Sequence, residues 1–305
     1  MLFPELLVKG DTIIIVAPAR KIGMNELHTA QKIFSGWGLE CLLSPSLQSN
    51  AHSYFSGTDA QRLQDLQSAL DNPGIKAIVC ARGGYGTTRI LDRIDLTSFT
   101  KNPKWLIGFS DITALHLLLE KNGIASIHGT MPILFGDPGS RQSIQSLQSA
   151  MMNGSCKITA PPVSLNHPGK VTAETVGGNL SLLVDSFGTK TELETDGKIL
   201  IIEEIDEYFY KLDRMMTQFK RSGKLDRIKG LIIGHMTDIQ ETSLPFGERV
   251  EEIILNALAG VSCPLAFNFP SGHENPNLAW IHGGMATLEV NDEGTTLQYD
   301  HFSKY

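Results

Sequence analysis

The sequence predicts an α/β protein with two domains, and three observations support this. Short apolar runs typical of buried strands alternate with segments whose hydrophobic residues recur at helical spacing, as in a parallel sheet covered by helices. The chain has 305 residues, which is long enough for two cores of ordinary size. Between residues 137 and 170 it becomes rich in Ser, Gln, Asn, Pro and Gly, which indicates a boundary.

The first expected elements are a strand and two helices. Residues 12–18 form a β-branched run closed by proline, typical of a strand buried on both faces. A helix should follow, with Asn25 as its N-cap and Gly38 beyond its end. The next helix carries the stronger signal, because Thr58 and Gln61 have the spacing of a capping box.

The pattern then repeats. A strand at 75–81 leads through a glycine loop to a short helix with Ile90 and Leu91, and a strand at 105–109 leads to a helix that runs through Leu119. This alternation predicts a mostly parallel sheet with right-handed crossovers and flanking helices, in layers like those of Rossmann and flavodoxin folds.

The second half is expected to form a smaller β/α domain. We assign residues 1–150 to the N-terminal domain, 151–170 to a linker that follows one helix, and 171–305 to the C-terminal domain. The elements predicted there are strands at 198–202 and 230–234, helices at 207–221 and 247–259, and a hairpin of 286–290 with 295–299.

Composition excludes several classes of function. The net charge is −7, and no dense run of Lys and Arg is present, which argues against a nucleic-acid partner. The N-terminus lacks the features of a secretion signal, and the apolar runs are well short of the roughly 20 residues that cross a bilayer. We therefore expect no membrane insertion and a cytoplasmic location. Free thiols in a reducing compartment are the expected state of the four scattered cysteines, Cys41, Cys80, Cys156 and Cys263.

Ser110 is the most informative position. A buried strand ends in Gly108-Phe-Ser110-Asp and passes directly into a helix, which is the arrangement of a nucleophile elbow. The usual elbow has a second glycine two residues after the serine, and Ile112 stands there instead. The alternative is that Ser110 or Asp111 caps the following helix.

The loop at residues 82–86, Arg-Gly-Gly-Tyr-Gly, also connects a strand to a helix. Its glycines let backbone N–H groups approach a ligand closely. The residues of the loop do not identify this ligand. It could be a phosphate or a developing oxyanion, or the loop could be a tight turn that binds no ligand. The loop lacks the glycine spacing of a dinucleotide site and the Lys-Ser/Thr ending of a P-loop.

Acidic residues end the apolar strand at 198–202, where ligand sites gather in α/β proteins. Any of them could instead form an ion pair with Lys211 or Arg214. They are Glu203, Glu204, Asp206 and Glu207.

Among the nine histidines, His273 is the strongest candidate for a general base. It lies in a loop punctuated by glycine and proline, and unperturbed imidazole titrates near neutrality. His116 lies in an apolar helix and is expected to be a core group, and His128 is a weaker candidate. No histidine spacing indicates a metal site, so we expect neither a metal nor another cofactor.

Five segments taken in order resemble the L,D-carboxypeptidase family of serine peptidases, which contains murein tetrapeptide carboxypeptidases and microcin immunity proteins. The resemblance covers nearly the whole chain. The segments are residues 82–91, 108–113, 177–179, 200–207 and 271–273.

The resemblance implies a catalytic triad with Ser110 as nucleophile, His273 as general base and Glu203 as the third member. The oxyanion hole would be the backbone N–H groups of Asp111 and Gly84. It also implies an N-terminal α/β domain with the serine, a smaller C-terminal β/α domain with the other two members, and a homodimer. The implied reaction is hydrolysis of the L,D-peptide bond that releases terminal D-alanine from murein tetrapeptide in peptidoglycan recycling.

Two branches of the family are distinguished by the glycine loop. The recycling branch carries Arg-Gly-Gly-Tyr-Gly followed by Arg, as here with Arg82 and Arg89, which favours murein peptide over a microcin-type aminoacyl-nucleotide. Arg82 is expected either to pair the terminal carboxylate of the substrate or to form a structural salt bridge. Tyr85 and Trp280 are expected to line the pocket. An alternative function is that of a non-catalytic binding module whose glycine loop holds a nucleotide or sugar phosphate.

Overall fold

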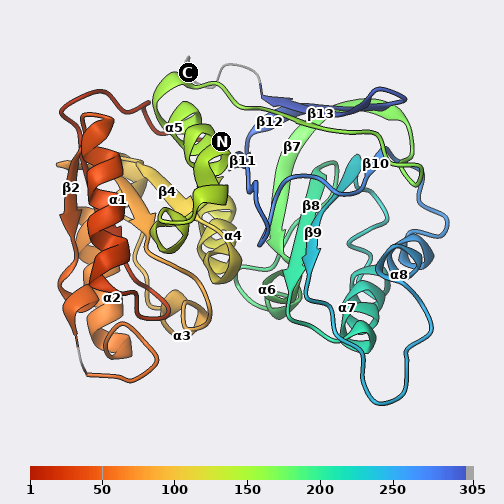
Figure 1. The fold of residues 1–305 in the computed structure, drawn as a ribbon, viewed down its shortest axis with the longest axis horizontal. Helices are drawn as coiled ribbons and strands as arrows, with labels where there is room; N and C mark the ends of the chain where they lie inside the picture. The colour runs from red at the N-terminus through yellow and green to blue at the C-terminus, as the bar shows by residue number, and fades with distance from the viewer. Residues whose placement is uncertain (50, 300–305) are drawn as a thin grey trace. The chain divides into compact units, whose positions relative to one another are not determined.

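The computed structural model describes residues 1–49 and 51–299 (Figure 1). The chain divides into two compact units. The first unit contains Met1–Cys156 and Asn275–Gly283, and the second contains Lys157–Glu274 and residues 284–299. The predicted α/β class with two domains is confirmed.

The first unit is built on a mainly parallel sheet whose strand order is β11-β5-β4-β3-β1-β2. Only β11 runs antiparallel, paired with β5 at one edge. Because β2 and β3 lie on opposite sides of β1, successive crossovers leave β1 in opposite directions, which makes a topological switch point. The strands are β1 Thr12–Val16, β2 Glu40–Leu43, β3 Ile75–Cys80, β4 Trp105–Gly108, β5 Ser126–His128 and β11 Trp280–His282.

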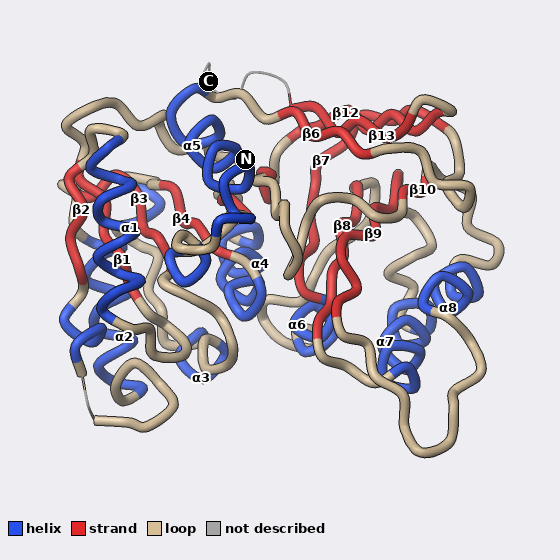
Figure 2. Tube along the Cα trace, viewed as in Figure 1, coloured by secondary structure: helices blue, strands red, loops and turns tan. Residues whose placement is uncertain are grey.

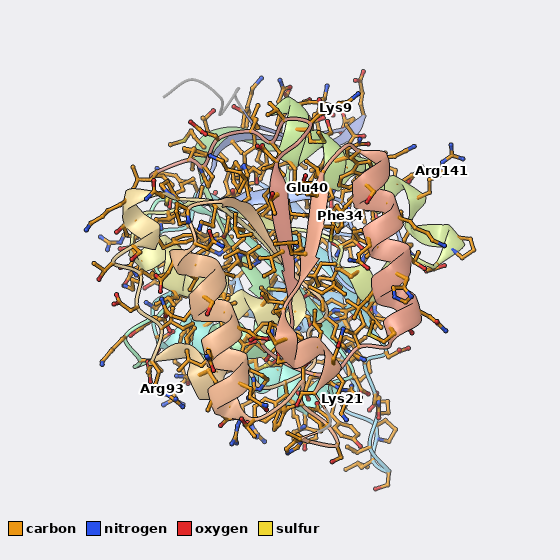
Figure 3. All side chains as sticks on the ribbon, turned by 90° about the vertical axis from the view of Figure 1, so that its left-hand side faces the viewer. Lys9, Lys21, Phe34, Glu40, Arg93 and Arg141 are labelled. Carbon is orange, nitrogen blue, oxygen red and sulfur yellow. The ribbon has the colours of Figure 1, made fainter. Side chains whose placement is uncertain are left out.

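The helices of this unit begin close to where the sequence places them. The capping box of Thr58 and Gln61 is present at the start of α2 and confirms that prediction. The N-cap of α1 is Gly23, so the expectation of Asn25 was wrong by two residues. Phe34 lies fully buried on the face of α1 that is turned toward the strands, whereas Arg141 extends outward (Figure 3). The α-helices are α1 Met24–Gly36, α2 Asp59–Asp71, α3 Thr88–Leu91, α4 Thr113–Lys121 and α5 Arg141–Asn153, and the short 3-10 helices are η1 Pro45–Gln48, η2 Phe99–Lys101, η3 Ser110–Ile112, η4 Pro132–Leu134 and η5 Pro138–Ser140.

The second unit has a mixed sheet in the order β10-β9-β8-β7-β12-β13-β6. Its long strand β7 pairs antiparallel with β12 through residues 169–174 and parallel with β8 through residues 175–179. The helices α7 and α8 pack against each other (Figure 2). The elements are β6 Lys157–Ala160, β7 Gly169–Asn179, α6 Leu180–Asp185, β8 Ile199–Ile205, α7 Phe209–Arg221, β9 Gly230–Thr237, α8 Val250–Ala257, β10 Leu265–Ala266, β12 Met285–Asn291 and β13 Gly294–Tyr299.

The boundary between the units differs from the expected linker. Residues 151–170 contain the end of α5, all of β6 and the first residues of β7. Residues 275–283, expected in the C-terminal domain, belong to the first unit through β11. Both differences arise from pairing with strands far away in the chain, which leaves no local signal. Across the described residues, no helix combines the length and apolar character needed to span a bilayer.

Candidate active site

Ser110 lies on a strained turn at the carboxyl end of β4. Its φ angle is +64°, in the left-handed region that a side chain disfavours. Among the described residues, the other non-glycine positions with positive φ are Asp or Asn, which tolerate this region better. Such a conformation costs on the order of 1–3 kcal/mol, and strained backbone of this kind is typical of nucleophile elbows. The N-cap of α4 is Ile112, so neither Ser110 nor Asp111 occupies the capping position.

The glycine loop packs directly against this turn. A Cβ atom at Gly83 would lie 2.9 Å from the Cβ of Ser110 and 3.2 Å from the backbone nitrogen of Asp111. Only glycine therefore allows the two backbones to come this close. Gly84 follows with φ +112°, so its peptide also has a conformation suited to glycine. The loop thus brings backbone amides beside the hydroxyl-bearing residue.

Buried polar groups hold the turn from beneath. Both ring nitrogens of His116 form hydrogen bonds. Nε2 lies 2.9 Å from the carbonyl oxygen of Gly108, and Nδ1 lies 2.7 Å from Oγ of Ser126. Because a carbonyl only accepts, Nε2 carries the proton and Nδ1 accepts from the serine. Burial lowers the pKa of His116 to about 4, which keeps the ring neutral. The interpretation of His116 as a satisfied core group is confirmed.

Asp111 joins the turn to the segment that follows the glycine loop. Its buried carboxylate accepts a 2.9 Å hydrogen bond from the backbone N–H of Thr87. Burial raises the pKa of this carboxyl, and the hydrogen bond to Thr87 opposes that change. The side chain of Asp111 therefore acts as a brace, while its backbone N–H belongs to the turn itself.

In the second unit, the structure separates the roles of the four acids that end β8. Glu203 contacts His273, with 2.7 Å between Oε2 and Nδ1. Glu207 pairs with Lys211 at 3.1 Å, and Asp206 accepts a hydrogen bond from Gln240. Glu203 is thus the carboxylate that orients the candidate base.

A bulge and two glycines make room for the Glu203 side chain. The pairing of β8 with β9 shifts between Ile202 and Glu204, so that Glu203 stands opposite both Gly234 and His235. A Cβ atom at Gly272 would lie 2.9 Å from the Cβ of Glu203, and one at Gly234 would lie 3.3 Å from it. The carboxylate is therefore enclosed by backbone that no larger residue would allow.

His273 is held in a defined tautomer by this carboxylate. Nδ1 donates to Glu203, so the neutral ring has its lone pair on Nε2. Burial disfavours the charged ring, but the charge and hydrogen bond of Glu203, with help from Glu204, outweigh it and raise the pKa of His273. The side chain is 14% exposed, whereas that of Glu203 is 1% exposed. An imidazole arranged in this way is suited to accept a proton through Nε2.

Glu204 is a second buried acid beside this pair. Its carboxylate accepts hydrogen bonds from Asn179 Nδ2 at 2.8 Å and from the N–H groups of Ser181 at 2.7 Å and Ile205 at 2.8 Å. Burial and then the neighbouring charge of Glu203 raise the pKa of Glu204 to about 7. It ties the end of β7 to β8 and adds negative charge near the imidazole.

The remaining expected site residues fall into different environments. Arg82 is half-buried and its Nη1 donates to the Lys21 carbonyl at 3.2 Å, and Tyr85 is 48% exposed. Arg89 forms an ion pair with Asp59 at 2.8 Å.

The expectation that Trp280 lines a pocket needs correction. The side chain is fully buried in β11, and its ring stacks on His128 with 4.7 Å between centroids. Trp280 and His128 therefore fill the interior of the first unit. The run of apolar and small residues around Trp280 in the sequence agrees with this role.

Sequence reasoning missed Arg20 and His235. Arg20 follows the proline that closes β1, and that position at the carboxyl edge of the sheet was a usable signal. The Nδ1 atom of His235 accepts a 3.2 Å hydrogen bond from the N–H of Glu274, and burial lowers its pKa. No local signal marked His235, because the bulge that places it depends on strand pairing.

The chain thus carries a serine on a strained turn, amides from a glycine loop and a buried carboxylate–imidazole pair. These groups define the serine hydrolase class. Residues 13–129 match the family model for the LD-carboxypeptidase N-terminal domain, and residues 172–288 match that for the LD-carboxypeptidase C-terminal domain. The chain belongs to the LD-carboxypeptidase family.

Individual relatives agree over nearly the full length. The probable murein peptide carboxypeptidase of Bacillus subtilis is 35% identical, with 97% of this chain and 94% of the relative covered. The crystal structure of muramoyltetrapeptide carboxypeptidase from Oxalobacter formigenes is 27% identical with a TM-score of 0.85, covering 95% of this chain and 99% of that one. The microcin C7 self immunity protein MccF is 22% identical with a TM-score of 0.86, covering 99% of both chains, and shares the fold.

Proposed function

We propose that this protein is a serine carboxypeptidase that hydrolyses the L,D-peptide bond of murein tetrapeptide and releases terminal D-alanine. The observation that carries the proposal is the 2.7 Å contact between His273 Nδ1 and Glu203 Oε2, which prepares the imidazole to act as a base. Membership of the LD-carboxypeptidase family supports the reaction, and the similarity to the murein peptide carboxypeptidases of Bacillus subtilis and Oxalobacter formigenes supports the substrate.

In the proposed mechanism, Nε2 of His273 removes the hydroxyl proton of Ser110 as Oγ attacks the carbonyl carbon of the scissile bond. Glu203 keeps the proton on Nδ1 and stabilises the imidazolium that forms. The reaction requires the hydroxyl and the imidazole to meet during catalysis. The strained turn at Ser110 favours this step, because it fixes the direction of the hydroxyl before substrate arrives.

The backbone N–H groups of Asp111 and Gly84 are the proposed donors to the tetrahedral oxyanion. Their support is the close packing of the glycine loop on the serine turn. Collapse of the tetrahedral intermediate breaks the bond to D-alanine, whose amine takes the proton from His273. Water activated by the same imidazole then hydrolyses the acyl-enzyme and restores Ser110.

Release of D-alanine from purified murein tetrapeptide tests the proposal. Ser110→Ala and His273→Ala should each reduce turnover by about 10³-fold or more while the thermal unfolding temperature stays close to wild type. Ser98→Ala, a change at an exposed serine outside the site, is the matched control and should retain full activity. Unchanged release of D-alanine by Ser110→Ala would refute the assignment of the nucleophile.

Two other functions are tested with the same protein. A microcin-type immunity peptidase would cleave an aminoacyl sulfamoyl adenosine faster than murein tetrapeptide, so rates measured side by side decide between these substrates. A non-catalytic module would bind nucleotide in calorimetry without hydrolysis, and its affinity would be unaffected by His273→Ala. The glycine loop with Arg82 and Arg89 favours the murein substrate through the family resemblance.

We also propose a cytoplasmic homodimer, on the basis of the same resemblance. The four cysteines are all free thiols, which fits a reducing compartment. Light scattering coupled to size exclusion measures the assembly, and a mass of one chain, 33.4 kDa, would contradict the dimer. Cell fractionation measures the location.

A further inference from the structure

Two arginines flank the topological switch point of the first unit. Arg20 follows the carboxyl end of β1, and Arg82 follows the carboxyl end of β3, the strand beside it. In open α/β sheets, ligands bind outside the carboxyl ends of the strands at this point. The guanidinium groups of Arg20 and Arg82 are therefore candidates for recognising an anion.

A buried frame fixes the two segments that carry these arginines. The guanidinium of Arg62 donates to the carbonyls of Pro18 and Gly86, and the residue is only 1% exposed. It thereby joins the segment after β1 to the end of the glycine loop. The backbone N–H of Lys21 also donates to the Tyr54 carbonyl at 3.1 Å, so the segment is held on both sides. The arginines therefore extend from rigid backbone.

Within the described residues, neither Arg20 nor Arg82 lies within 4.0 Å of a carboxylate. Arg82 donates from Nη1 to the carbonyl of Lys21, which places its guanidinium beside the residue next to Arg20. Burial lowers the pKa of Arg82, and the positive charge of Arg20 lowers it further. Tyr54 and Glu26 act in the opposite direction, but their effects are smaller. A bound anion would offset the repulsion between these two positive charges.

The arginine pair lies beside the proposed nucleophile. A Cβ atom at Gly84 would lie 2.2 Å from the Cδ of Arg20, so the aliphatic part of Arg20 packs against this glycine. The preceding glycine, Gly83, is in contact with Ser110. The ring of Tyr54 holds the guanidinium of Arg20, with 4.7 Å between Cζ and the ring centroid. A substrate group bound by the pair would therefore lie near the glycine loop that contacts Ser110.

We propose that Arg20 and Arg82 together bind the α-carboxylate of the C-terminal residue of the substrate. This inference rests on the proposed carboxypeptidase function. A carboxylate accepts two parallel hydrogen bonds from a guanidinium, and a second guanidinium can bind its remaining lone pairs. Such a clamp confines cleavage to the last peptide bond, since only the C-terminal residue of a peptide has a free α-carboxylate. Arg89 is excluded from this role by its pairing with Asp59.

The test compares two tetrapeptides that differ only at the C-terminus, one a free acid and the other a primary amide. Wild type should prefer the acid in kcat/KM by about 100-fold. Arg20→Gln and Arg82→Gln should each lower kcat/KM for the acid by about 30-fold or more and change that for the amide by less than 3-fold. Arg93→Gln removes an exposed arginine of the same unit and should leave both rates unchanged.

Additional variants and substrates distinguish the possible outcomes of this test. Arg20→Lys preserves the aliphatic chain and charge, and should retain part of the preference for the acid. Equal losses on acid and amide would overturn the inference. So would a loss that appears only with diaminopimelate and not with lysine at the third position, since the pair would then bind the side-chain carboxylate. If wild type released no D-alanine, the proposed function would fail, and calorimetry of Ser110→Ala with acid and amide would still test the pair.

Discussion

The two units position their reactive atoms by different physical means. In the first unit, the backbone of Ser110 itself is strained, with φ +64°. Gly83, which has no side chain, lets the glycine loop pack closely against this turn. In the second unit, the backbone of Glu203 is an ordinary strand, and a bulge in the neighbouring strand makes room for its side chain. A hydroxyl needs a fixed direction of attack, whereas the imidazole needs a buried charge behind it. The comparison suggests that mutations should damage orientation in one unit and electrostatics in the other.

The largest expected effect tests the electrostatic half of this comparison. Glu203→Gln keeps the size of the side chain but removes its charge, so His273 loses the group that raises its pKa and fixes its tautomer. We expect kcat to fall about 10⁴-fold, as when the triad carboxylate of a serine protease is made neutral. The pKa of His273, measured by NMR, should fall. A variant with an unchanged histidine pKa would contradict this account.

The next prediction compares the two units directly through glycine. Gly83→Ala should displace Ser110, and Gly272→Ala should displace the Glu203 side chain, since each added Cβ would lie 2.9 Å from its neighbour. Each change should lower kcat about 100-fold, because catalytic groups shifted by an ångström lose alignment. Only Gly272→Ala should alter the pKa of His273. Gly136→Ala, which has open space around it, is the control.

A pH-dependent stability change should come from the second unit. The pKa of Glu204 is about 7 in the folded protein and 4.5 as a free group, so its contribution is present below pH 4.5 and lost as the pH rises through 7. The raised pKa of His273 acts in the same direction, with a contribution present below pH 6.5 and lost above its folded value.

Unfolding by urea at several pH values measures this change. Between pH 5 and 8.5 the free energy of unfolding should fall by about 3 kcal/mol through Glu204. Glu204→Gln should be less stable than wild type at pH 5, since its amide cannot accept all three hydrogen bonds, but its stability should depend less on pH. An equally steep profile in the variant would show that Glu204 is not the titrating group.

The smallest expected effect concerns the support beneath Ser110. His116→Phe keeps the volume but leaves the Gly108 carbonyl and the Ser126 hydroxyl without their buried partner. We expect a loss of about 2 kcal/mol in unfolding free energy. If His116 only positions the turn, kcat should fall while the pH profile of activity keeps its wild-type midpoint. A shifted midpoint would assign His116 a role in proton transfer.

The sequence predicted the features that have local signals. The capping box at Thr58, the run that forms β8 and the hairpin of β12 with β13 all lie within short segments, and the structure contains each of them. Hydrophobic periodicity likewise predicted the alternation of β3, α3, β4 and α4, whereas the strands β2 and β5 were not predicted. Ser110 was a candidate because it follows an apolar strand, whereas Glu203 was one of four acids at the end of such a strand and was selected by the family resemblance.

The remaining features depend on contacts between distant parts of the chain. The edge strand β6 pairs with β13 more than a hundred residues later. Trp280 was expected to line the pocket, because the strand β5 with which its own strand pairs is equally remote in the chain. The bulge opposite Glu203 depends on the register of two strands, which no single segment encodes. Arg20 could have been noticed from its place after β1, but the frame that holds it required the structure.

The return of residues 275–283 to the first unit limits how this protein can be divided into fragments. Strand β11 covers one edge of β5, and its tryptophan fills the adjacent core. A truncated product that stopped at residue 156 would expose the hydrogen-bonding groups of β5 together with an unfilled hole, and such edges promote aggregation. Recombinant expression of the serine-bearing half alone therefore needs this nine-residue piece fused to it. Gene shuffling that exchanged the halves at a single junction would meet the same obstacle.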